Sequence, residues 1–202
     1  MKAYELGIPG AWVFEPPVFP DNRGQFAAPF QVAAFREALG FDLVLGQVNQ
    51  SISARGVIRG VHFSDVPPGQ AKYVSCARGS LVDVIVDIRV GSPAFGVVET
   101  VEMDPTSGRS VYLAEGLGHA FVALEDDTTM TYLCSTGYNP GSEHGISPLD
   151  PELGIPWPKG LPQVLSEKDT QAPTLAKARE TGLLPSWDAC QELYRSQREG
   201  QR

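Results

Sequence analysis

Short runs in which apolar and polar residues alternate recur along the chain, and the clearest of them spans residues 81–90. Successive side chains of a strand point to opposite faces, so this pattern predicts a β-strand. One face would carry Val82, Val84, Val86, Ile88 and Val90, and the other Leu81, Asp83, Ile85, Asp87 and Arg89. We expect the uniformly apolar face to pack between two sheets. Gly79 and Ser80 separate this run from the β-prone residues 71–78, so the two runs are predicted to form a hairpin.

The rest of the pattern predicts an all-β sandwich or barrel with few helices. Residues 109–138 predict two or three further strands, and the 21 glycines and 17 prolines divide the chain into short segments. One short helix is predicted in residues 30–40, because apolar residues recur at helical spacing and Gly40 supplies a C-cap. Residues 174–200 predict two short helices separated by a glycine and a proline.

Charge and cysteine content narrow the classes of function. The formal net charge is −8, and we expect no nucleic acid polymer as partner, because phosphate backbones bind basic stripes that this chain lacks. An anionic ligand would need a few cations placed in a pocket. The three cysteines are widely spaced without a C-x-x-C pattern, which predicts neither a disulfide framework nor a zinc site. No apolar run resembles a signal peptide or a membrane span, so we expect a cytoplasmic protein and no membrane partner.

His62 is the first candidate for chemistry, because it lies within an apolar, strand-like run between two cations, Arg59 and Lys72. A single histidine in a strand is more often structural than catalytic. Strict period-two geometry would also point Arg59 and His62 to opposite faces. Both can face one pocket only if the backbone bulges or twists near Gly60.

A metal is the obvious alternative for a histidine in a β-barrel. Metal-binding barrels of this kind typically show two histidines separated by one residue, but position 64 is a serine. His119 is left as the only plausible strand partner, without a convincing third ligand. We therefore expect no metal, which leaves His62 free to act as an acid or base. Taken singly, Tyr132 predicts a core aromatic residue and Asp169 a surface carboxylate.

A series of ordered blocks changes this interpretation. The blocks are "DNRGQF", "QVNQSIS", "GVIRGVHF", "PPGQAKYVSCARGSLVDVIVDIRVGSPAFG", "YLAEGLGHAF", "YLCSTGYNPGSEHGI", "DPELGIPWP" and "LSEKD". In this order they resemble the dTDP-4-dehydrorhamnose 3,5-epimerase family, over roughly residues 4 to 188. The resemblance rests on many blocks rather than one short motif.

The resemblance implies a fold, an assembly and an activity. The fold would be a metal-free cupin jelly roll, a double-stranded β-helix with short peripheral helices that are mainly C-terminal. One domain would fill residues 1–202, with N-terminal strands and a short helix in 1–50, the jelly-roll core in 51–160 and a helical segment in 161–202. The family forms homodimers that exchange N-terminal strands. It inverts C5, C3 or both in a dTDP-4-keto-6-deoxyhexose, without a cofactor.

The resemblance also implies four catalytic residues. A hydrogen next to the C4 ketone is acidic only if the resulting enolate is stabilised, so the site needs a base and a nearby cation. His62 matches the family's base, and Asp169 matches the carboxylate that orients this histidine. Lys72 matches the cation at the enolate oxygen. Tyr132 matches the acid that reprotonates the opposite face.

Further matches imply substrate contacts. These residues are Arg23, Phe26, Gln47, Asn49, Arg59, His119, Tyr138, Glu143 and Lys168. The polar cluster around Arg59 and Lys168 would hold the diphosphate and nearby sugar groups, and Tyr138 would stack on thymine. Arg23 would come from the exchanged strand of the partner subunit. We also expect Asp83 in or near the barrel interior, beside Lys72 or Arg59.

Two departures from the family pattern affect the predicted substrate. Ala28 stands where the family usually has a glutamate, and the usual "HGF" is "HAF" at residues 119–121. Together with "ALEDDTTMTY" they resemble the branch that serves antibiotic deoxysugars, whose members invert C5 only, C3 only or both, also on 2-deoxy or 3-amino sugars. Two other classes stay open. A metal-dependent cupin enzyme predicts stoichiometric metal, and a non-catalytic sugar-nucleotide binding protein predicts loss of the base, the acid or the lysine.

Overall fold

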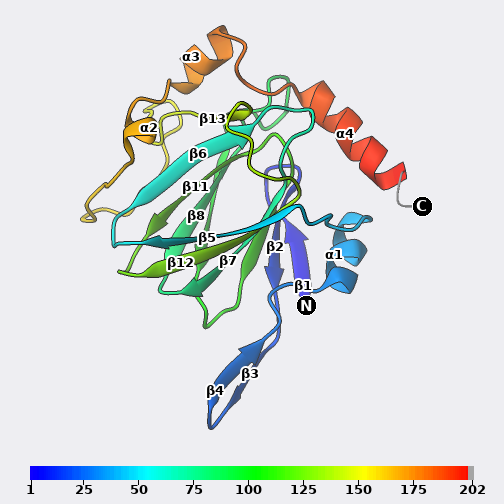
Figure 1. Cartoon of the computed structure of the whole chain (residues 1–202), viewed down its shortest axis with the longest axis vertical. Helices are drawn as coiled ribbons and strands as arrows, with labels where there is room; N and C mark the ends of the chain where they lie inside the picture. Colours follow the sequence, from blue (N-terminus) through cyan, green and yellow to red (C-terminus); the bar gives the residue numbers. More distant parts are fainter. Residues whose placement is uncertain (200–202) are drawn as a thin grey trace.

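The computed structural model describes residues 1–199, and two antiparallel sheets form its centre (Figure 1). Across the six-stranded sheet the order is β1 (Lys2–Glu5), β2 (Ala11–Glu15), β10 (Ser110–Leu113), β7 (Lys72–Arg78), β12 (Thr128–Cys134) and β5 (Gln47–Ser53). Across the five-stranded sheet it is β13 (Glu143–Gly145), β6 (Ile58–Ser64), β11 (Gly118–Ala123), β8 (Leu81–Val86) and β9 (Val98–Met103). The prediction of an all-β protein is therefore confirmed.

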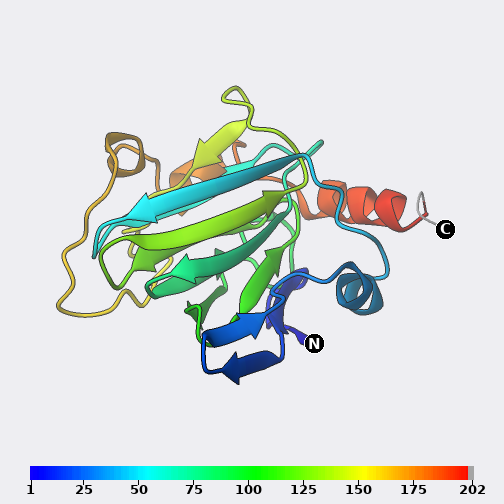
Figure 2. The same cartoon turned by 60° about the horizontal axis from the view of Figure 1, so that its bottom comes forward.

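The remaining elements lie outside these sheets. A separate hairpin consists of β3 (Val18–Asp21) and β4 (Gly24–Ala27). The helices are α1 (Val32–Leu39), α2 (Glu167–Thr170), α3 (Leu175–Glu180) and α4 (Trp187–Glu199). In Figure 1 the hairpin extends away from the sheets, and in both Figure 1 and Figure 2 it lies far from α2 and α4. No helix within residues 1–199 is long and apolar enough to cross a membrane.

Both predicted helical regions are confirmed. α1 ends at Gly40, whose φ of 83° is left-handed and whose N–H donates to the Arg36 carbonyl. α3 and α4 are separated by a segment that contains Gly182 and Pro185. The short helix α2 was not predicted, because its four residues give no helical periodicity.

Apolar side chains from both sheets fill the space between them. Leu81 and Ile85 of β8 pack there with Val74 and Met130 of the six-stranded sheet, and all four are at most 1 % exposed. Complete burial of one such side chain contributes about 1.5–3 kcal/mol. The face of β8 that carries Leu81 and Ile85 therefore points into the interior. The uniformly apolar face of β8 points outward.

The prediction for the apolar face of residues 81–90 is accordingly wrong. Val84 and Val86 point outward from the five-stranded sheet and pack with Leu175 and Leu184 of the C-terminal segment. Alternation fixes which residues share a face, but it does not show what covers that face. Here the C-terminal segment covers the apolar face, whereas the barrel interior also accepts a carboxylate, Asp83.

The predicted hairpin across Gly79 and Ser80 is also wrong. β7 lies between β10 and β12 in one sheet, whereas β8 lies between β11 and β9 in the other. Gly79, at φ 72°, carries the chain from the first sheet to the second. β10 and β12 occupy the two sides of β7, and β11 and β9 occupy the two sides of β8, so β7 and β8 cannot pair.

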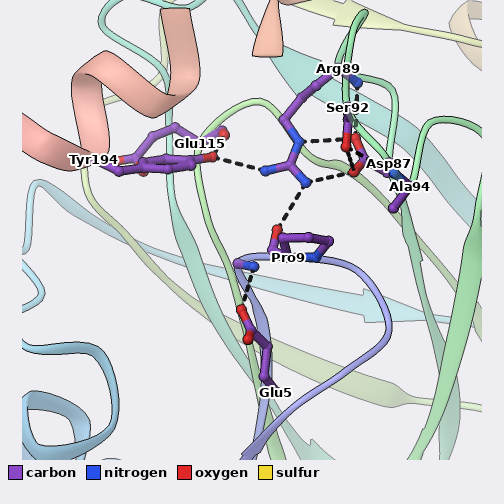
Figure 3. Close-up of polar contacts among 9 residues, drawn as sticks. Glu5, Pro9, Asp87, Arg89, Ser92, Ala94, Glu115 and Tyr194 are labelled. Atoms are coloured by element: carbon purple, nitrogen blue, oxygen red, sulfur yellow. Dashed lines mark hydrogen bonds and ion pairs between the residues drawn. The ribbon is translucent and has the colours of Figure 1, made fainter. Parts of the chain in front are cut away.

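A buried ion pair joins the barrel to the N-terminal loop and to α4 (Figure 3). Arg89 and Asp87 are fully buried, and two guanidinium nitrogens of Arg89 donate to the Asp87 carboxylate at 2.9 and 2.6 Å. Arg89 also donates to the Pro9 carbonyl at 2.9 Å and to the Tyr194 hydroxyl of α4 at 3.3 Å. The guanidinium lies 4.6 Å from the ring centroid of Trp187. These contacts hold three segments of the chain together.

We expect Asp87→Ala to lower the free energy of unfolding by about 3–5 kcal/mol, because the substitution leaves the buried Arg89 without its counter-ion. Glu180→Ala is the matched control, since Glu180 pairs with Lys177 at 2.8 Å on the surface. An exposed pair of this kind contributes only about 0–1 kcal/mol. Urea denaturation of both variants measures the difference, and equal costs for the two would contradict it.

Candidate active site

A pocket of about 320 Å³ opens at one end of the five-stranded sheet. β6, β13, α2 and the loops beside them form its walls. Six of the predicted site residues line it: Arg59, His62, Tyr138, Glu143, Lys168 and Asp169. The structure thus brings together residues from distant parts of the sequence, and it places two basic side chains, Arg59 and Lys168, in one pocket.

His62 and Asp169 form the central contact of this pocket. His62 Nε2 lies 2.6 Å from Asp169 Oδ1, although the residues are 107 positions apart in the sequence. Ser166 caps α2 by accepting a hydrogen bond from the Asp169 N–H, which fixes the turn that presents the carboxylate. Asp169 is only 4 % exposed.

The charge state of Asp169 determines what His62 can do. Burial raises the pKa of the Asp169 carboxyl, but hydrogen bonds from His62 and Ser166 outweigh it, so this pKa lies below its ordinary value. An ionised carboxylate only accepts hydrogen bonds, so His62 Nε2 carries the proton and Nδ1 is the basic nitrogen. The arrangement is suited to proton abstraction.

A bulge in β6 allows Arg59 and His62 to face the same pocket. His62 lies opposite His119 of β11. Arg59 lies opposite Phe121, so β6 spans three residue steps where β11 spans two. Gly60 lies within this irregularity at φ 128°, a backbone conformation that favours glycine. The expected bulge near Gly60 is confirmed.

His119 connects the pocket with the facing sheet. His62 and His119 are direct cross-strand partners, so their side chains lie on the same face of the five-stranded sheet. The His119 ring meets the Tyr132 ring edge-on, with centroids 6.1 Å apart. Tyr132 belongs to β12 of the six-stranded sheet. The candidate base and the candidate acid therefore approach the barrel interior from opposite sheets.

Asp83 lies in the barrel interior as expected, but its partner differs from the prediction. His119 Nε2 lies 2.6 Å from Asp83 Oδ1, and neither Lys72 nor Arg59 forms an ion pair with this carboxylate among the described residues. In the β8–β11 register His119 lies opposite Ile85, so Asp83 is its diagonal neighbour and within reach. Asp83 was predicted to lie beside a lysine or an arginine, and it is instead bound by His119.

Tyr132 is protonated at neutral pH. Burial raises the pKa of its phenol to about 12, although hydrogen bonding with Ser51 and the charge of Arg59 both act to lower it. Its hydroxyl lies 3.3 Å from Ser51 Oγ of β5. A phenol held in this state can donate a proton.

Lys72 begins β7, where it lies opposite Leu113 on one side and Cys134 on the other. Burial lowers the pKa of its ammonium group, whereas the carboxylates of Glu143 and Asp83 act to raise it. Within residues 1–199 its ammonium group makes no side-chain hydrogen bond and no ion pair. This cation is therefore available to a ligand.

Two of the remaining predicted contacts, Gln47 and Asn49, lie beside the pocket and are linked to residues that line it. Gln47 donates to Asn49 at 2.5 Å along β5, and Gln47 Oε1 accepts the N–H of Tyr138 at 2.9 Å. Tyr138 is 61 % exposed, so its side chain is accessible to a ligand. Glu143 accepts a hydrogen bond from Ser64 at 3.1 Å.

Arg23 and Phe26 do not reach the pocket of their own chain. Both lie in the β3–β4 hairpin, which extends away from the sheets (Figure 1). Arg23 is paired with its neighbour Asp21 at 2.5 Å, and Phe26 is 68 % exposed. Phe26 lies opposite Phe19, which is also exposed, and adjacent exposed apolar side chains are typical of a surface that contacts another molecule.

Sequence reasoning missed His144, which lines the pocket and lies 2.8 Å from Asp65. It belongs to the three-residue strand β13, which is too short to show alternation. Its position directly after the predicted contact Glu143 was the available signal. No group of three or more His, Cys, Asp or Glu side chains within residues 1–199 is placed to hold a metal ion.

Comparison with known proteins decides the family. The family model described as dTDP-4-dehydrorhamnose 3,5-epimerase matches residues 5–177. The chain belongs to this family. It is therefore an isomerase, and the resemblance seen in its sequence blocks is confirmed.

Curated relatives of this epimerase cover nearly the whole chain. A dTDP-4-dehydro-6-deoxyglucose 3-epimerase from Streptomyces bikiniensis is 50% identical over 96% of this chain and 100% of its own length. A dTDP-4-dehydrorhamnose 3,5-epimerase from Mycolicibacterium smegmatis is 51% identical over 98% of both chains. Single and double epimerases are therefore about equally similar to this chain.

Solved structures agree with the fold of this epimerase. A 3'-monoepimerase from Streptomyces bikiniensis in complex with dTDP-quinovose has a TM-score of 0.93 and 50% identity, covering 96% of this chain and 98% of its own. A 4-keto-6-deoxy sugar epimerase from the novobiocin cluster of Streptomyces spheroides has a TM-score of 0.91 and 52% identity, covering 94% and 95%. The predicted cupin jelly roll with short, mainly C-terminal helices is confirmed.

Proposed function

We propose that this enzyme inverts one or both carbons next to the C4 ketone of a dTDP-4-keto-6-deoxyhexose. The observation that carries the proposal is the 2.6 Å contact of His62 with a buried, ionised Asp169, in a pocket that also holds Arg59 and Lys168. It combines a base for a carbon acid with two cations for a diphosphate.

The reaction has two proton transfers with an enolate between them. His62 Nδ1 removes the proton from the carbon next to the ketone, and the electron pair of that bond moves to the ketone oxygen. The ammonium group of Lys72 stabilises the negative oxygen. The enolate then collapses as its carbon takes a proton from the Tyr132 hydroxyl on the other face. The configuration at that carbon is now inverted, His62 is protonated and Tyr132 is a phenolate.

The nucleotide would be held at the mouth of the pocket. Arg59 and Lys168 would bind the diphosphate with Gln47 and Asn49, and the exposed Tyr138 ring would stack on thymine. His119 and Glu143 would contact the sugar.

Arg23 and Phe26 would come from the partner subunit of a homodimer that exchanges N-terminal strands. Their position on a hairpin directed away from their own site supports this assembly. We place the enzyme in the cytoplasm, where its sugar-nucleotide substrate would be made.

A single inversion at C3 is the second candidate. Relatives that are 50% to 52% identical are named 3-epimerases, from Streptomyces bikiniensis and Streptomyces niveus, and one structural neighbour comes from the novobiocin cluster. The novobiocin-cluster neighbour supports an antibiotic sugar as a candidate substrate beside rhamnose.

The test is conversion of dTDP-4-keto-6-deoxyglucose in deuterated water, followed by NMR at each carbon. We expect deuterium at C3, or at both C3 and C5. Each carbon that receives its deuteron from Tyr132 should also have its configuration inverted. Label at C3 alone would select the single epimerase. Absence of label with this sugar and with its 2-deoxy and 3-amino analogues would refute the proposed function.

A further inference from the structure

Each inversion leaves the enzyme in the wrong protonation state for the next one. If the proposed function holds, His62 ends one turnover with an additional proton and Tyr132 ends it with one fewer. His62 borders the open pocket and its side chain is 35 % exposed, so it can return its proton to water. Tyr132 packs against the apolar core and does not border the opening of this pocket, so a proton reaches it most directly through a hydrogen-bonded side chain while the site is occupied.

Ser51 is the side chain placed to supply this route. Its Oγ lies 3.3 Å from the Tyr132 hydroxyl, and either oxygen can be the donor. Tyr132 lies opposite Asn49 in the β5–β12 register, so Ser51 is its diagonal neighbour on the same face. A serine hydroxyl can donate one hydrogen bond and accept another at the same time, as a relay requires.

The position of β5 brings this hydroxyl close to solvent. β5 is the last strand of the six-stranded sheet and pairs with β12 alone within residues 1–199. Ser51 itself is only partly buried, so its side chain keeps contact with solvent. The competing route through His119 is less direct, because among the described residues His119 makes only a ring contact with Tyr132 and its Nε2 is bound to Asp83.

Arg59 supports the same route. Its charge lowers the pKa of Tyr132 and so favours the phenolate that remains after proton donation. Arg59 is held beside β5 because its Nε donates to Ser53 Oγ at 3.1 Å and its Nη2 to the Ile52 carbonyl at 3.3 Å. The Tyr132 phenolate is therefore stabilised by Arg59, which is held against β5, the strand that contains Ser51.

We propose that Ser51 is the relay through which Tyr132 regains its proton between turnovers. The Ser51 hydroxyl gives its proton to the Tyr132 phenolate while its oxygen takes a proton from solvent water. The hydroxide left behind is neutralised by the proton that His62 releases, so atoms and charge balance over the cycle. Ser51 contacts no substrate atom in this scheme, which makes it a positioning and relay residue.

The test separates the first turnover from the later ones. With enzyme in excess over dTDP-4-keto-6-deoxyglucose, Ser51→Ala should complete the first inversion within about threefold of the wild-type rate, because Tyr132 starts protonated. Under steady-state conditions its kcat should fall about tenfold or more, since a placed proton-transfer group contributes ~10²–10⁴. KM should be unchanged, and Ser51→Thr, which keeps the hydroxyl, should restore kcat.

Two controls keep the outcomes distinct. Ser75→Ala removes the same hydroxyl from β7 of the same sheet, in a residue with no side-chain hydrogen bond among the described residues, and should leave both rates unchanged. An equal fall in the first and later turnovers of Ser51→Ala, or no fall in either, would overturn the relay. Tyr132→Phe tests the proposed function separately, because full single-turnover inversion in that variant would refute Tyr132 as the acid.

Discussion

His62→Asn should lower the rate of epimerisation by about 10²–10⁴-fold, the contribution of a placed general base. Asparagine is close in size and can still donate a hydrogen bond to Asp169, so the local fold should persist. It has no basic nitrogen, so the carbon next to the ketone cannot lose its proton. The measurement is the initial rate of sugar inversion by NMR, together with the Tm of the variant.

His144→Asn is the matched control for this substitution. His144 lines the same pocket, and its Nε2 is held by Asp65 at 2.8 Å, much as Asp169 holds His62. Because the proposed mechanism assigns no proton transfer to His144, its replacement should change the rate less than tenfold. Comparable losses in both variants would show that His62 acts through the shape of the pocket and would contradict its role as base.

Lys72→Met should remove activity and at the same time stabilise the fold. Loss of one group that stabilises a developing oxyanion costs about 10²–10³ in rate. Burial penalises the charged form of this lysine, so its pKa in the folded protein lies below the value of the unfolded chain. Methionine fills a similar volume without a buried charge. Hence the Tm of the variant should exceed that of the wild type at pH 7.

The same pKa direction sets the pH dependence of the wild-type protein. Between the folded and the unfolded pKa of Lys72, the unfolded chain binds more protons, so stability rises with pH. The Tm advantage of Lys72→Met should therefore shrink as pH rises through the folded pKa, while wild-type activity declines because the lysine loses its charge. This alkaline limb should lie below the ordinary lysine value of 10.5.

Lys177→Met on the exposed face of α3 is the control, with an expected change within about 0.5 kcal/mol. A Lys72→Met variant that is active, or less stable than the wild type at pH 7, would contradict the assigned role of Lys72.

The candidate site could be predicted only in part from local sequence. Alternation along the strand showed that Arg59 and His62 would point to opposite faces of a regular strand. Gly60 indicated where a bulge in β6 would let both face one pocket. The pairing of His62 with Asp169 was not visible locally, because the two residues lie 107 positions apart and α2 has no helical periodicity. Only the ordered family blocks connected them.

The errors in the fold have a common physical origin. Alternation in residues 81–90 correctly predicted β8, but it did not show that the C-terminal segment would cover Val84 and Val86. The consecutive strands β7 and β8 were expected to pair, yet they lie in different sheets, where β7 pairs with β10 and β12 and β8 pairs with β11 and β9. Asp83 was expected to pair with a cation. Its actual partner, His119, is its diagonal neighbour only in the register of β8 with β11, which the sequence does not show. Each of these outcomes was decided by contacts between segments that are far apart in the sequence, either through packing or through strand pairing.

The most direct test of the central claim, that separate groups remove and return the proton on opposite faces, is Tyr132→Phe in deuterated water. The mechanism predicts that His62 still removes the proton, exchanges it with solvent through the open pocket and returns deuterium to the same face. The sugar should therefore gain label next to the ketone while keeping its configuration. Inversion at the wild-type rate, or a variant that takes up no deuterium, would contradict the account.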